Sequence, residues 1–155
     1  MAENLRIAEG GKNEKYELLY KQIASLIEAE SDPIANMANV SSMLHQTFGF
    51  WWTGFYRVVR GELVLGPFQG PMACTRIAKG KGVCGTAWSE GRTQVVEDVD
   101  KFPGHIACSS LSRSEIVVPI WHDNEVIGVL DIDSEHLATF DSTDQEWLER
   151  IVQLL

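Results

Sequence analysis

The residue types best suited to redox or nucleophilic chemistry in this chain are its three cysteines, Cys74, Cys84 and Cys108. Their spacing fits no common zinc motif, and no C-x-x-C pair occurs, so we expect no metal site. Cys74 and Cys108 lie in stretches rich in glycine, proline and serine, which favour loops, where function concentrates. Cys84 stands at the start of an expected helix, whose N-terminus favours a thiolate. The alternative is that all three are buried thiols that only pack.

A second candidate group consists of three acids on two consecutive expected strands, Glu115, Asp131 and Asp133. A turn centred on Asp123 would pair Glu115 with Asp131, and a turn centred on Asn124 would pair it with Asp133. Either register puts all three carboxylates on one face of the sheet. The other face would then carry Ile116, Val118, Ile120, Val126, Leu130 and Ile132.

Such a carboxylate cluster is unfavourable by itself, because like charges raise one another's pKa and the group titrates as a unit. It would be stabilised by a bound cation, either a divalent metal or an ammonium group, although hard metals prefer sites with loop carbonyls nearby. A solvated strand end without a function is the alternative interpretation. A further candidate is an aromatic strand in which alternation directs Trp52, Gly54 and Tyr56 to one face. These rings either pack in the core or, with an opening at the glycine, receive an apolar ligand group.

The elements that must position these residues follow from hydrophobic periodicity and turn signals. Helices are expected over residues 14–30, 33–48, 82–90 and from 142 onward, and strands over 51–59, 62–68, 93–96, 115–121 and 125–133. The segments 69–81 and 97–114 are expected to be long loops, which in a compact domain are usually functional. A capping box is expected at Ser142-Thr143-Asp144-Gln145. This pattern predicts one α+β domain whose antiparallel sheet carries helices on one face.

Composition limits the classes of function that fit this chain. Its 155 residues are 45% hydrophobic, enough for one real core, and its net charge of −9 disfavours nucleic acid as a partner. The longest apolar run is residues 116–121, far short of the roughly 20 residues that span a bilayer. The opening residues are polar, so we expect no secretory leader and a cytoplasmic location.

Six strings in the chain closely resemble the free methionine-(R)-sulfoxide reductases, which are enzymes built on a GAF domain. They are Trp52-Thr53-Gly54-Phe55-Tyr56, Leu65-Gly66-Pro67-Phe68-Gln69-Gly70, Gly80-Lys81-Gly82-Val83-Cys84-Gly85-Thr86, Phe102-Pro103-Gly104-His105-Ile106-Ala107-Cys108, Ser114-Glu115-Ile116-Val117-Val118-Pro119 and Gly128-Val129-Leu130-Asp131-Ile132-Asp133-Ser134. The resemblance covers residues 14–155, after a polar N-terminal segment, 1–13. It is specific, because ordinary ligand-sensing GAF domains lack three cysteines at these spacings. It implies a central antiparallel sheet with helices on one face and active-site loops on the other.

The resemblance also assigns roles to the candidate residues. It implies that Cys108 is the nucleophile, that Cys74 is the leading resolving cysteine, and that Cys84 is a second thiol able to form a disulfide. Substrate-binding residues implied in the same way are Trp52, Tyr56, Glu115, Asp131 and Asp133. No cofactor is implied. Thioredoxin is the implied reductant, and a homodimer is compatible with the family.

The chemistry of that family requires an activated thiolate, a proton donor and a second thiol. Lys101, His105 and Arg113 are the nearby cations that could activate Cys108. The donor should be an acid of raised pKa, either Glu115 or Asp131. Attack on the sulfoxide would leave a sulfenic acid, which a second thiol converts to a disulfide. The alternative function is a non-catalytic GAF module that binds a small ligand or senses oxidants.

Overall fold

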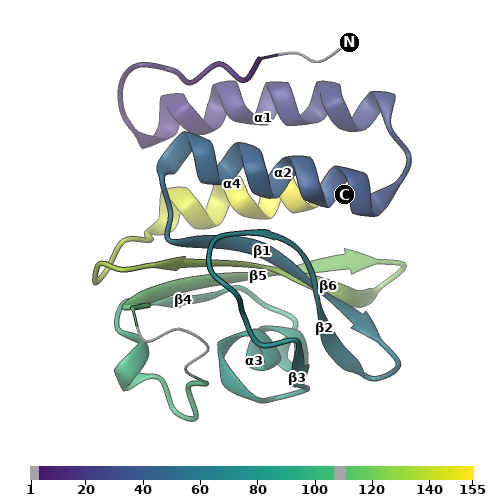
Figure 1. Ribbon diagram of the computed structural model, residues 1–155, viewed down its shortest axis with the longest axis vertical. Coiled ribbons are helices and arrows are strands. Elements are labelled where there is room, and N and C mark those ends of the chain that lie inside the picture. The colour runs from purple at the N-terminus through teal and green to yellow at the C-terminus, as the bar shows by residue number, and fades with distance from the viewer. Residues whose placement is uncertain (1–3, 107–110) are drawn as a thin grey trace.

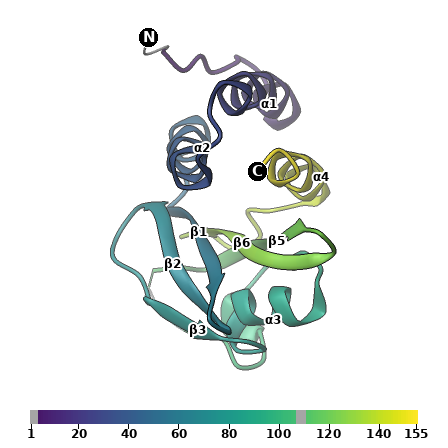
Figure 2. The same ribbon diagram turned by 90° about the vertical axis from the view of Figure 1, so that its right-hand side faces the viewer.

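The computed structural model describes residues 4–106 and 111–155, which form a layered α+β structure around one sheet (Figure 1). The helices are α1 (Lys12–Ala29), α2 (Pro33–Phe48), α3 (Gly82–Glu90) and α4 (Ser142–Val152), with a short 3₁₀ turn η1 (Val99–Lys101). The strands are β1 (Trp52–Val59), β2 (Glu62–Gln69), β3 (Arg76–Ala78), β4 (Gln94–Val96), β5 (Ser114–His122) and β6 (Glu125–Ser134). Figure 2 shows α1, α2 and α4 on one side of the sheet and α3 with its connecting loops on the other. None of the helices in the described ranges has the length and apolar character needed to cross a membrane.

The six strands lie in the order β3-β2-β1-β6-β5-β4, and every neighbouring pair is antiparallel. The expected antiparallel α+β architecture is therefore confirmed. Strand β3 was not predicted and lies within the segment expected to be a loop, 69–81. It escapes a pattern search because it has three residues, of which only Ile77 is buried.

The hairpin between β5 and β6 takes the second of the two registers considered, with Glu115 opposite Asp133. Its two turn residues, Asp123 and Asn124, both have positive φ (50° and 63°), as a two-residue turn that follows the strand twist requires. Further along, Ile120 faces Gly128 whereas Trp121 faces Val126, so β6 has one extra residue. This bulge reverses the alternation. Val126 therefore packs on the pocket side of the sheet, and its predicted place on the helix side is wrong.

Alternation along the strands divides the interior into two cores. Phe55, Ile116 and Leu130 are fully buried against α1, α2 and α4. Trp52 and Tyr56 point to the opposite face, where they pack with the residues of α3. The first core makes the sheet a rigid platform, and the second surrounds the candidate site.

The N-cap residue of helix α4 is Asp141, one residue before the expected position. The capping box is formed by Asp141 and Asp144 rather than by a box opening at Ser142, because the Asp141 carboxylate accepts the backbone N–H groups of Thr143 and Asp144. Asp144 is itself buried and also binds α1, accepting hydrogen bonds from the Tyr16 hydroxyl and the Lys12 ammonium at 2.6 Å each. One acidic side chain therefore fastens α1 to α4.

Candidate active site

A pocket opens on the sheet face opposite α1, α2 and α4. Its floor comes from the middle strands β1, β5 and β6, and its walls come from the start of α3 and two loops. The lining residues are Trp52, Tyr56, Met72, Ala73, Ile77, Lys81, Gly82, Val83, Cys84, His105, Ile106, Ser112, Glu115, Asp131 and Asp133. The pocket therefore contains the three acids and the two aromatic residues that the sequence indicated.

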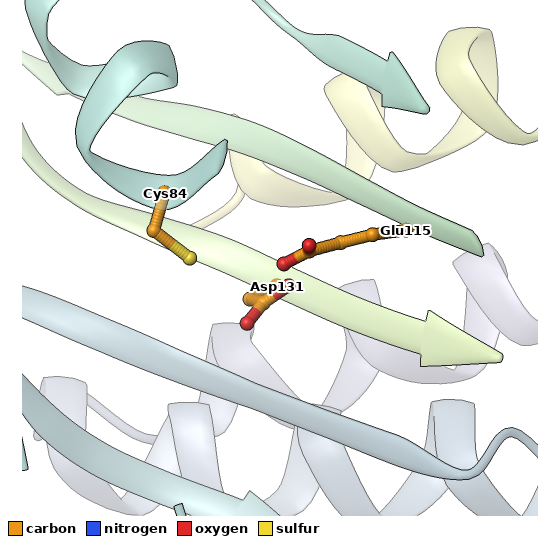
Figure 3. Close-up of side chains that lie close together, drawn as sticks. All are labelled: Cys84, Glu115 and Asp131. Carbon is orange, nitrogen blue, oxygen red and sulfur yellow. The ribbon is translucent and has the colours of Figure 1, made fainter. Parts of the chain in front are cut away.

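The register of three adjacent strands brings the acids together. Asp133 on β6 lies between Trp52 on β1 and Glu115 on β5, and Asp131 is the next residue of β6 on the same face. Figure 3 shows Glu115 and Asp131 pointing toward each other from neighbouring strands, with Cys84 directed at them from α3. Glu115 and Asp131 are each only 6% exposed, so this cluster is not a solvated strand end.

Burial is the largest influence on these carboxyl groups. It raises the pKa of Glu115 well above its ordinary value, and the neighbouring charges of Asp131 and Asp133 raise it further. The pKa of Asp133 is raised by burial and by Asp131. Burial also raises the pKa of Asp131, but hydrogen bonds from Glu115 and Cys84 oppose that rise by stabilising its charged form. This difference favours a protonated Glu115 that donates to a charged Asp131.

One oxygen atom of the acid cluster has no hydrogen-bond partner among the described residues. Asp133 Oδ1 accepts a hydrogen bond from Ser112 Oγ at 2.9 Å, and Glu115 Oε1 lies 4.0 Å from His105 Nε2. Asp131 Oδ1 is buried and has no hydrogen-bond partner among the described residues. A buried acceptor without a donor is costly, so the pocket is prepared for a ligand that brings N–H groups or positive charge.

Cys84 lies in the first turn of α3, as expected, and its thiol is inside this cluster. Burial raises the pKa of its thiol well above the ordinary value, and the charges of Asp131 and Glu115 raise it further. The expected thiolate character of Cys84 is therefore wrong, because burial and the nearby acids outweigh the helix N-terminus. The donor atoms of Cys84, Glu115 and Asp131 lie within 4.8 Å of one another, close enough to share a metal ion. Such an ion would have to displace the protons that these raised pKa values retain.

The aromatic wall is more closely packed than the sequence suggested. The Trp52 ring stacks on Phe68 with centroids 5.2 Å apart and on Tyr56 at 6.0 Å. A Cβ placed on Gly54 would lie 2.6 Å from the Trp52 ring and 2.4 Å from Phe68. The glycine therefore makes room for Trp52 itself, and the predicted opening for a ligand at Gly54 is not found there.

The three cysteines differ in their situation. Cys84 is a free thiol, and Cys74 is disulfide-bonded. The loop that carries Cys74 is fixed to the pocket wall, since Tyr56 Oη donates to the Cys74 carbonyl oxygen at 2.8 Å and Trp52 Nε1 donates to that of Pro71 at 3.0 Å. Cys108, the candidate nucleophile, lies outside the described residues.

Of the three cations proposed to activate Cys108, His105 is the one that lines the pocket. Ser112 was not singled out, although its hydroxyl binds Asp133. Ser112 belongs to a segment with several serines, and no pattern separated it from its neighbours. Met72 and Ile77 were missed because both lie in a segment without apolar periodicity.

The fold and the pocket together define a GAF domain, and a family model described as GAF domain matches residues 39–155. GAF domain-containing protein A of Dictyostelium discoideum is 56% identical over 156 residues, covering 100% of this chain and 99% of the relative. Free methionine-R-sulfoxide reductase of Escherichia coli (strain K12) is 44% identical over 145 residues, covering 93% and 88%. The X-ray structure of free methionine-R-sulfoxide reductase from Neisseria meningitidis in complex with its substrate has a TM-score of 0.96 and 53% identity, covering 97% of this chain and 92% of that one. This chain belongs to the free methionine-R-sulfoxide reductases of the GAF-domain family.

Proposed function

We propose that this protein reduces free L-methionine-(R)-sulfoxide to L-methionine with electrons from a dithiol. The observation that carries the proposal is the buried acid cluster on the pocket floor, in which Asp131 Oδ1 has no hydrogen-bond partner within residues 4–106 and 111–155. The related proteins of Escherichia coli and Neisseria meningitidis bear that activity in their names.

The acid cluster accounts for the choice of a free amino acid. The α-ammonium group supplies the positive charge and the three donors that Asp131 and its neighbours lack. A peptide-bonded methionine sulfoxide has a neutral nitrogen there and would leave buried carboxyl groups unpaired. Leaving a desolvated carboxyl group unpaired in this way costs on the order of 3–5 kcal/mol. In the bound substrate, the methyl end of the side chain lies against the ring of Trp52, and Tyr56 completes the same wall.

The first chemical step is nucleophilic attack. The Cys108 thiolate attacks the sulfoxide sulfur, the sulfur–oxygen bond breaks, and the oxygen ends on Cys108 as a sulfenic acid while methionine leaves. One proton is consumed. Glu115 is its source, because burial and the neighbouring Asp131 and Asp133 raise its pKa and so favour its protonated form. This assignment selects Glu115 over Asp131, whose charged form is stabilised by hydrogen bonds.

The second step restores the nucleophile. The Cys74 thiol attacks the sulfenic acid, forms a disulfide with Cys108 and releases water. The disulfide-bonded state of Cys74 and the free thiol of Cys84 support this order. The raised pKa of Cys84 leaves little thiolate, so it is the secondary resolving thiol. Thioredoxin then reduces the disulfide by exchange and is itself oxidised. We place this cycle in the cytoplasm and in a homodimer.

The experiment that tests the proposal follows NADPH consumption with thioredoxin, thioredoxin reductase and free L-methionine-(R)-sulfoxide. Wild type should turn over, and Cys108→Ser should not. N-acetyl-methionine-(R)-sulfoxide, which lacks the ammonium charge, should be a poor substrate at equal concentration. If wild type is no faster than Cys108→Ser while still binding the free amino acid, the protein is a non-catalytic sensor module instead.

A further inference from the structure

The loop that carries Cys74 is held to the pocket wall by two aromatic side chains of β1. Tyr56 Oη donates to the Cys74 carbonyl oxygen, and Trp52 Nε1 donates to the Pro71 carbonyl oxygen, in both cases across 18 or more residues of sequence. A third hydrogen bond, from the Leu65 backbone N–H to the Thr75 carbonyl oxygen at 3.0 Å, joins the next residue of the loop to β2. The backbone on both sides of the cysteine is therefore fixed, by side chains that also line the pocket.

The backbone is also constrained at Gly70, where this loop begins. Gly70 has a φ of +128°, and a Cβ there would lie 2.8 Å from the Trp51 carbonyl oxygen and 2.8 Å from Trp52 Cδ1. The loop backbone thus lies directly on β1. Between its two anchored carbonyls the Met72 side chain is 90% exposed, whereas Ala73 packs against the pocket core.

Tyr56 is well suited to hold a main-chain carbonyl. Its side chain is 2% exposed, and burial together with the charges of Asp131 and Cys84 raises the pKa of its phenol, so the hydroxyl stays a donor. The hydroxyl donates its hydrogen bond to the Cys74 carbonyl oxygen.

We propose that Tyr56 is a positioning residue for the resolving thiol: its hydroxyl holds Cys74 where it can reach the oxidised nucleophile. This inference rests on the proposed function and concerns only its second step. In that step the Cys74 thiol attacks the Cys108 sulfenic acid, one sulfur–sulfur bond forms, one sulfur–oxygen bond breaks, and water leaves. Holding the attacking group in place raises its effective concentration in the step that uses it. Reduction of the sulfoxide by Cys108 does not need that contact.

The test separates the two steps in Tyr56→Phe, which keeps the ring and removes only the hydroxyl. Reduced enzyme is mixed with excess free L-methionine-(R)-sulfoxide without any reductant, and samples are quenched over time. Methionine formed and free thiols remaining are both measured, and dimedone labels sulfenic acid for mass analysis. In wild type, methionine formation and the loss of two thiols should run together. In Tyr56→Phe, thiol loss should fall about fivefold behind methionine formation, the effect of one hydrogen bond, and labelled sulfenic acid accumulates.

A matched control is Tyr20→Phe, which removes a tyrosine hydroxyl on α1, on the other side of the sheet, and should change neither rate. Thiol loss at the wild-type rate in Tyr56→Phe, or a proportional slowing of methionine formation, overturns the inference. Absence of methionine in wild type would instead overturn the proposed function.

Discussion

Two buried acidic sites lie on opposite faces of the same sheet, and they are completed in different ways. On the helix face, Asp144 is 1% exposed and binds the Lys12 ammonium, the Tyr16 hydroxyl and the Asp141 backbone N–H. On the pocket face, burial raises the pKa of both Glu115 and Asp131, and His105 Nε2 lies 4.0 Å from Glu115 Oε1.

The difference indicates how structural and functional acids can be told apart. Burying a carboxyl group is costly unless its lone pairs and its charge are satisfied. The chain satisfies Asp144 from its own residues, so that site contributes to stability. Among the described residues, the pocket acids have one another, Cys84 and the Ser112 hydroxyl as hydrogen-bond partners, and Asp131 Oδ1 has none. A ligand that brings positive charge completes this second site.

The largest expected effect comes from Asp131→Asn, which removes the charge that the ligand would neutralise. We expect kcat/KM for the free amino acid to fall on the order of 10²–10³-fold, because one partner of a buried charge pair is lost. The free energy of unfolding should not fall. Coupled NADPH consumption and urea denaturation measure the two quantities. Asp123→Asn, on the exposed β5–β6 turn, is the matched control; equal activity in both variants would contradict the assignment.

On the helix face we expect the opposite result, a loss of stability without a loss of activity. Asp144→Asn should lower the free energy of unfolding by about 2–3 kcal/mol, since hydrogen bonds to a charged group are lost. The kcat/KM of the folded enzyme should be unchanged, because Asp144 lies behind the sheet. Urea denaturation checks the first statement and steady-state kinetics the second. Asp141→Asn keeps a good N-cap residue and should cost much less. A loss of kcat/KM in Asp144→Asn without a loss of stability would erase the distinction between the two sites.

The sequence predicted the pocket acids well because strand alternation is insensitive to a shift of two residues. Both registers considered put Glu115, Asp131 and Asp133 on one face, so their clustering was predictable while their pairing was not. The pairing depended on the two-residue turn at Asp123 and Asn124, whose positive φ angles the residue types permit but do not demand.

The features that sequence reasoning missed depend on contacts distant in the chain. Val126 changes face because β6 has a bulge, and a bulge leaves no mark in a hydrophobic pattern. The pKa of Cys84 rises because α3 packs against strands more than 30 residues further on, where the acids lie. Local sequence placed Cys84 correctly at a helix start but gave no information about the charges facing it.

The pH dependence of stability should differ between the two sites. The pKa of Glu115 in the folded protein is above its unfolded value, so its contribution to stability is present at low pH and is lost as the pH rises. Asp141 behaves oppositely: burial raises its pKa, but the Asp144 backbone N–H and Lys12 outweigh this and lower it, so its contribution is lost as the pH falls below about 4.

Glu115→Gln isolates the first of these contributions. At pH 4.5 its Tm should equal that of wild type, and at pH 8 it should exceed wild type by about 4 °C. Differential scanning fluorimetry across this range measures the difference. A constant offset at all pH values would show that packing, not ionisation, distinguishes the variant.

The smallest expected effect concerns two serines beside the same strand. Ser112 Oγ donates to Asp133 Oδ1 at 2.9 Å in the pocket, whereas Ser114 Oγ donates to the His136 carbonyl oxygen at 2.6 Å outside it. Ser112→Ala should lower kcat/KM roughly threefold to tenfold, which corresponds to one hydrogen bond to a carboxyl group. Ser114→Ala should lower the free energy of unfolding instead, because the His136 carbonyl loses one donor and the Thr139 backbone N–H loses its acceptor. Steady-state kinetics and urea denaturation of both variants test this. If the two variants lose activity and stability in the same proportion, Ser112 supports the strand and not the acid.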